Sequence, residues 1–106
     1  MRITIDVTKR DIDRGTADAC PVTLAVRRAL GVRKDSKLGR YLLIGISNIC
    51  FLDEDGWFET DLAAMPNIAQ DFVNDFDRGR TVAPFSFVAN FNQERAKLVG
   101  LTLPTK

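Results

Sequence analysis

The residues best suited to chemistry in this sequence are charged, and the basic ones gather in one segment. Residues 27–40 contain a single acid, Asp35, and six basic side chains. The basic residues are Arg27, Arg28, Arg33, Lys34, Lys37 and Arg40. Such a cluster can hold phosphate groups, so we treat it as a candidate anion-binding site for a nucleotide or a nucleic acid. The alternative is that basic residues near a helix C-terminus simply complement the helix dipole.

Acidic residues dominate residues 53–77, where no basic residue occurs. Asp71 and Asp75 are four residues apart in a predicted helix, a like-charge spacing that is mildly destabilising. An acidic surface kept against that preference predicts a basic partner, with the carboxylates imitating nucleic-acid phosphates. A solvated helix face is the alternative. The candidate partner-binding residues are Asp53, Glu54, Asp55, Asp71 and Asp75.

The sequence offers little to an enzyme. Histidine is absent, which removes the commonest general base and the commonest zinc ligand. No glycine-rich phosphate loop occurs. Three successive acids at 53–55 could bind a hard cation, but they lack the ordered ligand spacing of a calcium loop. We therefore predict a protein that is not an enzyme and that uses no cofactor and no metal.

The two cysteines, Cys20 and Cys50, are predicted to be free thiols in a cytosolic protein, with a single bridge as the alternative. Cys20 stands where a helix N-cap would stand. Because the positive end of a helix dipole activates a thiol, Cys20 is the candidate reactive cysteine. The alternative is that Cys20 only packs beneath the start of the helix. Cys50 lies within a predicted strand and is expected to be buried.

A helix over residues 21–30 is the best-defined element that would position these groups. Pro21 suits the first helical position, and Gly31 suits a left-handed residue after the last turn. Thr23, Arg27 and Arg28 are expected to point outward. The expected buried face consists of Val22, Ala25, Val26, Ala29 and Leu30.

Alternating apolar and polar residues predict strands over 2–7 and 85–91, and the apolar residues 49–52 are expected to form another strand. A capping box from Thr8 to Asp11 predicts a short helical turn between the first strand and Gly15. Residues 31–39 are expected to form a basic loop. Residues 41–46 are apolar on both faces, which predicts a central strand.

Asp55-Gly56 predicts a hairpin turn before a strand over 57–60. Its register is open between pairing Glu54 with Trp57 and pairing Leu52 with Trp57.

A second helix is predicted from Pro66 to about Asp77. Its expected buried residues are Met65, Ile68, Ala69, Phe72, Val73 and Phe76. Beyond residue 91 the pattern weakens. Residues 98–103 could add a strand to this molecule or to the sheet of a partner, which leaves a homodimer open.

These elements predict an α+β fold, with a mostly antiparallel sheet of four to five strands and two helices packed on one face, similar to a split β-α-β arrangement. The 106 residues suit a single domain over 1–91, followed by a tail over 92–106. No apolar run is long enough to span a membrane, and no signal-peptide pattern occurs at the start, so we expect a cytoplasmic protein.

Two patches of the sequence resemble the beginning and the end of a group of small uncharacterised proteins encoded by tailed phages and prophages. The first patch runs from Val7 through Gly15 to the helix at 21–30, and the second runs from Phe72 to Phe87. The resemblance covers about half of the chain and consists mostly of caps, turns and core phenylalanines. It implies a phage or prophage origin in a bacterial cytoplasm and supplies no activity.

Together these observations predict a stoichiometric binding protein. The leading hypothesis is a phage-type accessory protein that inhibits a host protein or nucleoprotein complex, such as a defence nuclease, through the acidic surface. The alternative is a protein that binds or sequesters a nucleotide or a nucleic acid through the basic segment 27–40.

Overall fold

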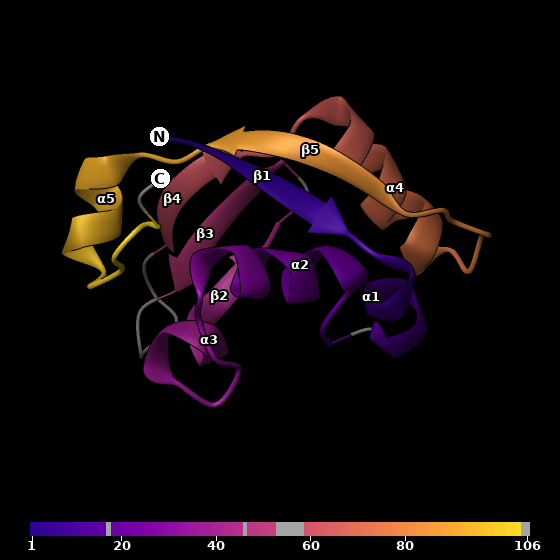
Figure 1. Cartoon of the computed structure of the whole chain (residues 1–106), viewed down its shortest axis with the longest axis horizontal. Coiled ribbons are helices and arrows are strands. Elements are labelled where there is room, and N and C mark those ends of the chain that lie inside the picture. Colours follow the sequence, from indigo (N-terminus) through magenta and orange to yellow (C-terminus); the bar gives the residue numbers. More distant parts are fainter. Residues whose placement is uncertain (17, 46, 53–58, 105–106) are drawn as a thin grey trace.

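The computed structural model describes residues 1–16, 18–45, 47–52 and 59–104. Its first sheet pairs β1 (Arg2–Val7) with β5 (Phe85–Asn90) in antiparallel fashion, with Ile5 opposite Phe87. The first and the last strand of the chain therefore lie side by side, although more than 75 residues separate them in sequence (Figure 1). Alternate residues of β1 are buried and exposed, as predicted. The buried face of this sheet supplies much of the core.

The second sheet is antiparallel and has the order β2-β3-β4, formed by Leu42–Ile44, Asn48–Leu52 and Glu59–Ala64. The prediction of a central strand over 41–46 is wrong, because β3 is central and β2 lies at the edge with Leu43 exposed. Leu52 pairs with Glu59, so the alternative register with Leu52 opposite Trp57 is also wrong. The predicted turn at Asp55-Gly56 lies outside the described residues.

Helix α2 (Pro21–Leu30) packs against β1 and has the predicted ends. Pro21 is its first residue, and Gly31 adopts φ 68°, the left-handed conformation that glycine tolerates best. Val22, Ala25, Val26 and Leu30 are buried as predicted, with Ala29 partly buried. Thr23 is also buried, contrary to prediction, because β2 and Val73 lie along that flank of the helix.

Helix α1 (Lys9–Arg14) joins β1 to α2, and its capping box is the predicted one. The Asp11 backbone N–H donates to Thr8 Oγ1 at 3.2 Å, and the Thr8 N–H donates to Asp11 Oδ2 at 2.9 Å. Gly15 ends the helix.

Helix α3 (Lys37–Tyr41) occupies the segment expected to be the end of a loop and the start of a strand. Ser36 caps it by accepting a hydrogen bond from the Gly39 N–H at 3.1 Å. Gly39 lies against the preceding loop so closely that a Cβ atom there would be 1.9 Å from the Arg33 carbonyl oxygen. Only glycine permits this approach between α3 and the loop.

Helix α4 (Asn67–Asp77) packs through Phe72, whose ring centroid lies 4.7 Å from that of Phe85 on β5. Ala69 is buried, and Val73 and Phe76 pack partly against the core. Ile68 is 55% exposed, so its predicted burial is wrong. The buried face of α4 is narrower than expected, so Ile68 lies at the edge of that face, along the same side of the helix as Asp71 and Asp75.

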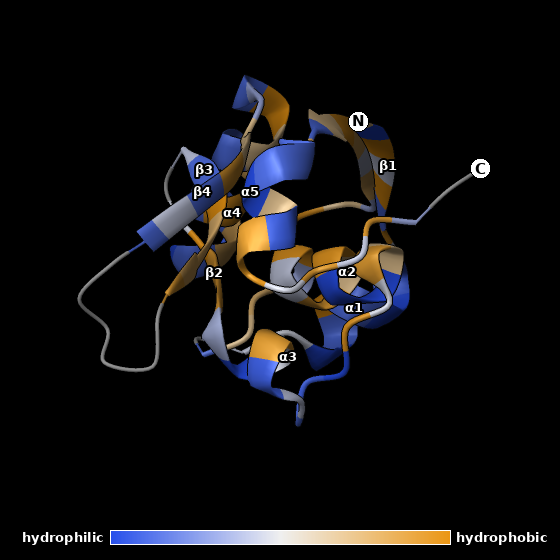
Figure 2. Cartoon of the chain, turned by 90° about the vertical axis from the view of Figure 1, so that its left-hand side faces the viewer, coloured by the Kyte–Doolittle hydropathy of each residue, from blue (hydrophilic) through white to orange (hydrophobic). Residues whose placement is uncertain are grey.

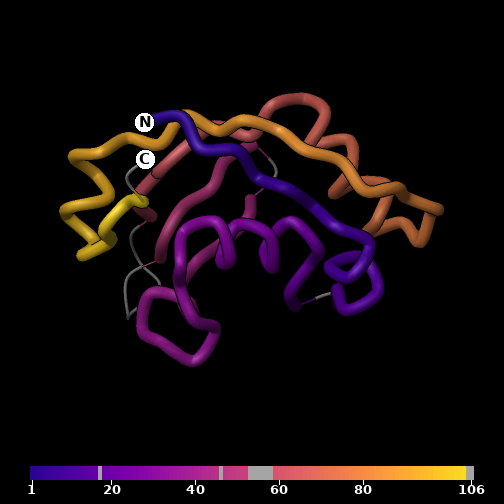
Figure 3. Tube along the Cα trace, viewed as in Figure 1, coloured from indigo at the N-terminus to yellow at the C-terminus, as the bar shows by residue number. Residues whose placement is uncertain are grey.

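Residues 98–103 add no strand to the sheets of this chain, because helix α5 (Gln93–Leu98) ends at Leu98 and residues 99–103 form a turn and irregular structure. Addition of a strand to the sheet of a partner stays a prediction. Asn92 caps this helix by accepting a hydrogen bond from the Arg95 N–H at 3.0 Å. Ala96 and Leu101 are buried in the core, and the Asn92 N–H donates to the Leu62 carbonyl of β4. Helix α5 lies at the opposite end of the molecule from α1 (Figure 3) and presents mostly hydrophilic residues outward (Figure 2).

The predicted α+β class and the antiparallel pairing are confirmed, with the strands divided between two sheets of two and three strands. The described residues form five helices and five strands around one apolar core. Helices α2 and α4 both contribute to that core, as does the buried face of the β1–β5 sheet. None of the helices in the described ranges has the length and apolar composition needed to cross a membrane.

Candidate functional site

Basic side chains from three segments line one hollow of about 630 Å³, which we call the basic hollow. It lies between α1, α2 and the loop after α2. Its basic residues are Arg10, Arg14, Arg27, Arg28 and Lys34. Asp11 is the one acid that the described part of the chain contributes to the lining, together with Thr16, Ala19 and Leu24. The lining is therefore strongly cationic, which favours anions.

Helix α1 supplies Arg10 and Arg14, which the sequence analysis did not single out. They are four residues apart and therefore share one face of the helix. Two like charges at this spacing are mildly unfavourable for an isolated helix. Both arginines line one wall of the basic hollow.

The Arg28 side chain of α2 is held in place by Asp11 of α1. Its Nη1 and Nη2 donate to the two carboxylate oxygens of Asp11 at 2.8 and 2.7 Å, and Nη2 also donates to the Asp6 carbonyl at 2.7 Å. The Arg28 hydrogen bonds hold the pKa of Asp11 below its usual value, helped by the Thr8 N–H, while burial opposes this shift. The same pairing raises the pKa of Arg28. The Asp11 carboxylate thus joins α1 to α2, and the Arg28 guanidinium also joins α2 to β1 through the Asp6 carbonyl.

We expect Asp11→Asn to lower the free energy of unfolding at pH 7 by about 1–2 kcal/mol, because it weakens the capping box and the charged pairing. Solvent screens part of the ion pair, since half of the Arg28 side chain is exposed. The pKa of Asp11 is lower in the folded state than its ordinary value of 3.8. The contribution of this carboxylate is therefore complete above about pH 4–5 and declines as the pH falls through the folded-state pKa.

Urea unfolding at pH 7 and at pH 3 measures both effects. Wild type should lose more stability between these pH values than the Asp11→Asn variant does. Asp13→Asn, an exposed substitution on the same helix, is the control and should follow wild type. Parallel pH profiles for wild type and Asp11→Asn would show that the pairing does not stabilise the fold.

Arg27 reaches from α2 toward α3, where its Nη2 donates to the Gly39 carbonyl at 3.1 Å. Its Nε–H is buried and finds no hydrogen-bond acceptor among the described residues. Buried donors are rarely left without a partner. Water or an oxygen of a bound anion can supply the acceptor that the described part of the chain does not.

The structure brings only part of the predicted anion-binding segment together. Arg27, Arg28 and Lys34 line the basic hollow. Arg33 is exposed and pairs with Asp35 at 3.4 Å. Lys37 lines a different pocket, and Arg40 is exposed and does not line the hollow.

The predicted acidic surface is only partly described. Asp53, Glu54 and Asp55 lie outside the described residues. Asp71 is exposed on α4, and Asp75 forms an ion pair with Arg80 at 3.1 Å. The acidic-surface hypothesis stays a prediction.

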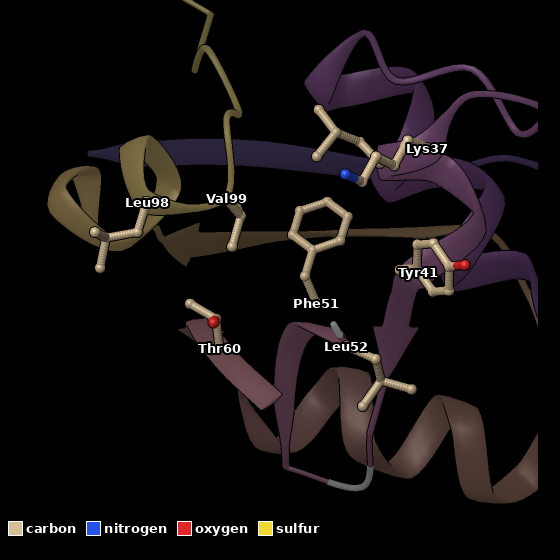
Figure 4. A pocket seen from close by; sticks show the side chains of 8 residues that line it. Lys37, Tyr41, Phe51, Leu52, Thr60, Leu98 and Val99 are labelled. Atoms are coloured by element: carbon tan, nitrogen blue, oxygen red, sulfur yellow. The ribbon is translucent and has the colours of Figure 1, made fainter. Parts of the chain in front are cut away.

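A second pocket of about 340 Å³ lies between α3, β3 and the end of α5 (Figure 4). Figure 4 shows Phe51 between Lys37, Tyr41 and Val99. Leu38, Leu52, Thr60 and Leu98 complete the lining, which is mainly apolar. This pocket was not predicted from the sequence, because neither helix α3 nor helix α5, which supply part of its lining, was expected.

Both cysteines are free. Cys20 is the N-cap residue of α2, but its side chain caps no backbone N–H, and its Sγ lies 3.3 Å from Thr23 Oγ1. Its reactivity stays a prediction. Cys50 is buried, as predicted, and burial raises its pKa to about 11, with Glu59 and Asp61 contributing further negative charge.

Comparisons with protein-family models, with curated proteins and with solved structures find no match to this chain. The resemblance to phage and prophage proteins therefore stays an expectation from the sequence, and the function must be argued from the site itself.

Proposed function

We propose that this protein binds nucleic acid through backbone phosphates held in the basic hollow. The observation that carries the proposal is the convergence of five basic side chains from α1, α2 and the following loop on one concave surface. The one acid among them, Asp11, is already paired with Arg28. The remaining cations are Arg10, Arg14, Arg27 and Lys34. Arg27 donates one hydrogen bond to the Gly39 carbonyl, but none of the four forms an ion pair within the described part of the chain, so their charges can neutralise phosphates.

The chemistry of the lining indicates how the ligand is recognised. Among the residues that the structure describes, no aromatic side chain lines the basic hollow, so the described lining offers no surface on which bases could stack. We therefore infer that binding depends on phosphate spacing and charge, with little dependence on sequence. Such a protein would act stoichiometrically, and a bacterial cytoplasm is the compartment that we propose for it.

Fluorescence anisotropy with labelled single-stranded and double-stranded DNA and RNA tests this proposal. We expect binding at low salt for unrelated sequences of equal length. The logarithm of the binding constant should fall with the logarithm of salt concentration, with a slope of up to about −4 if four cations contact phosphates. A nucleoside triphosphate included as competitor distinguishes a nucleotide site from a site for a strand. Absence of binding to every oligonucleotide at low salt would contradict the proposal.

A different observation favours a second candidate function, inhibition of a host protein by α4. Ile68, Asp71 and Asp75 follow one another along one face of this helix, and Ile68 is the largest exposed apolar side chain on it. An exposed apolar residue in an acidic stripe is suited to a partner with a basic rim around an apolar pocket.

Affinity purification from a bacterial lysate tests this second candidate, with wild type and an Asp71→Lys, Asp75→Lys variant processed in parallel. We expect a host protein or nucleoprotein complex to be retained by wild type and lost from the variant. Identical retained proteins in both samples would exclude binding through this face of α4.

A further inference from the structure

Three side chains of metal-ligating types meet on one face of the β3–β4 pair, and none of them lines the basic hollow. Cys50 lies on β3, and Glu59 and Asp61 lie on β4. The Cys50 Sγ and one carboxylate oxygen from each acid all lie within 4.8 Å of one another. Neighbouring carboxylates repel each other unless a cation or a proton is shared between them.

An irregularity in the sheet creates this arrangement. The pairing of β3 with β4 shifts between Ile49 and Cys50, so that Ile49 faces Ala63 whereas Cys50 faces Asp61. Continued regular pairing would instead place Cys50 opposite Leu62, which is buried in the core. Opposite residues in an antiparallel pair point to the same face of the sheet. The shift therefore directs the thiol toward Asp61, and Glu59 follows two residues away on that same face.

The burial of the three groups differs in a way that suits an ion entering from solvent. Cys50 is completely buried, and no hydrogen bond to its thiol is found within the described part of the chain. Glu59 and Asp61 are exposed above it. The Asn48 Nδ2 group donates to Asp61 Oδ1 at 2.6 Å, which fixes the orientation of that carboxylate and leaves its second oxygen for a ligand.

We propose that Cys50, Glu59 and Asp61 bind a divalent transition-metal ion of the zinc class. A tetrahedral zinc ion bound by one sulfur and two oxygens holds its donor atoms about 3.4–3.6 Å apart. Small rotations of the exposed Glu59 and Asp61 side chains bring the donors from within 4.8 Å to that spacing. The fourth position faces solvent and takes water. On binding, the thiol proton passes to solvent and the sulfur becomes a ligand as the thiolate.

The donor set also predicts which ions are excluded. Calcium and magnesium prefer oxygen ligands only, and a thiolate among the ligands favours zinc or cobalt over them. The negative potential of two carboxylates beside the buried sulfur attracts the cation, whose own charge then stabilises the thiolate. From the sequence, the acids at 53–55 were considered as cation ligands. The grouping of Cys50 with Glu59 and Asp61 was not predicted, since it depends on the pairing register of β3 and β4.

Titration of the reduced protein with Co²⁺ tests the proposal, because a cobalt–thiolate bond gives a charge-transfer band in the near ultraviolet. We expect one Co²⁺ per chain, displacement by Zn²⁺, and no displacement by excess Mg²⁺. Cys50→Ala should abolish the band, while Cys20→Ala, which removes the other thiol, should keep it. Glu59→Gln combined with Asp61→Asn should weaken Co²⁺ binding at least tenfold.

The Glu59→Gln, Asp61→Asn variant changes only exposed side chains, so it tests the metal site even if Cys50→Ala fails to fold. No band in wild type, a band that persists in Cys50→Ala, or unchanged Co²⁺ affinity in the Glu59→Gln, Asp61→Asn variant would each overturn the proposal.

Discussion

Phe72→Ala is expected to lower the free energy of unfolding by about 3–5 kcal/mol, the usual range for truncating a buried phenylalanine. Phe72 is buried on α4, and its ring contacts Phe85 of β5 at a centroid distance of 4.7 Å. The substitution removes this contact and leaves a cavity between the helix and the β1–β5 sheet. Alanine favours helices more than phenylalanine does, so the loss would come from packing alone. Thermal unfolding should shift downward by at least about 12 °C.

Ile68→Ala is the matched control for this prediction. It removes an apolar side chain from the same helix one turn earlier, where 55% of the residue is exposed. We expect a loss below about 1 kcal/mol, since little of that side chain is removed from water by folding. Equal losses for the two variants, measured by urea unfolding, would show that α4 does not pack on the sheet through Phe72.

Replacing both Arg10 and Arg14 with Glu is expected to weaken binding of a DNA or RNA oligonucleotide about a hundredfold or more at low salt. The reason is that two cations facing the phosphates become two anions on the same wall of the basic hollow. The salt dependence should fall at the same time, by about 2 in slope, because two phosphate contacts are lost. Anisotropy titrations at several salt concentrations measure both quantities.

A control variant with the same change in net charge distinguishes binding at the basic hollow from non-specific electrostatic attraction. Arg78→Glu combined with Lys97→Glu changes two exposed residues outside the basic hollow, and both variants take the formal charge from +1 to −3. Lys97 lies on α5, at the other end of the molecule from α1. We expect this control to reduce affinity far less than the α1 variant does. Equal reductions would mean that net charge, and no particular surface, determines binding.

Local sequence rules were sufficient for the elements whose ends are defined by neighbouring residues. The capping box of Thr8 and Asp11, and the Pro21 and Gly31 ends of α2, are present as predicted. These features depend on contacts three or four residues apart, which the sequence displays directly.

The errors occurred where distant contacts decide the outcome. Apolar alternation over 98–103 left an added strand open, but Leu98 ends α5, and Leu101 is buried in the core with Val99 and Leu103 packed against it. Thr23 was expected outside because hydropathy does not show that β2 covers that flank. Each case shows tertiary packing overriding a weak local preference.

The candidate site was only half visible in the sequence for the same reason. Arg27, Arg28 and Lys34 belong to one basic segment, so their proximity was predictable. Arg10 and Arg14 enter the site because α1 packs against α2, and the Asp11–Arg28 ion pair joins residues 17 positions apart. The two like charges at positions 10 and 14, four residues apart in a predicted helical turn, were the sequence feature that could have indicated a contribution of this turn to the site.

The tight packing at Gly39 limits which amino-acid substitutions this position can accept during evolution. A side chain at position 39 would displace the loop through Arg33 and Lys34, and Gly39 also provides the carbonyl that receives Arg27. Position 39 therefore influences two of the basic residues although it carries no charge itself. An exchange of lysine and arginine at positions 10, 14 and 34 would keep the charge of the basic hollow, whereas a change at this glycine would alter the shape of the surface. A search for relatives that share the site should weigh this uncharged position alongside the charged ones.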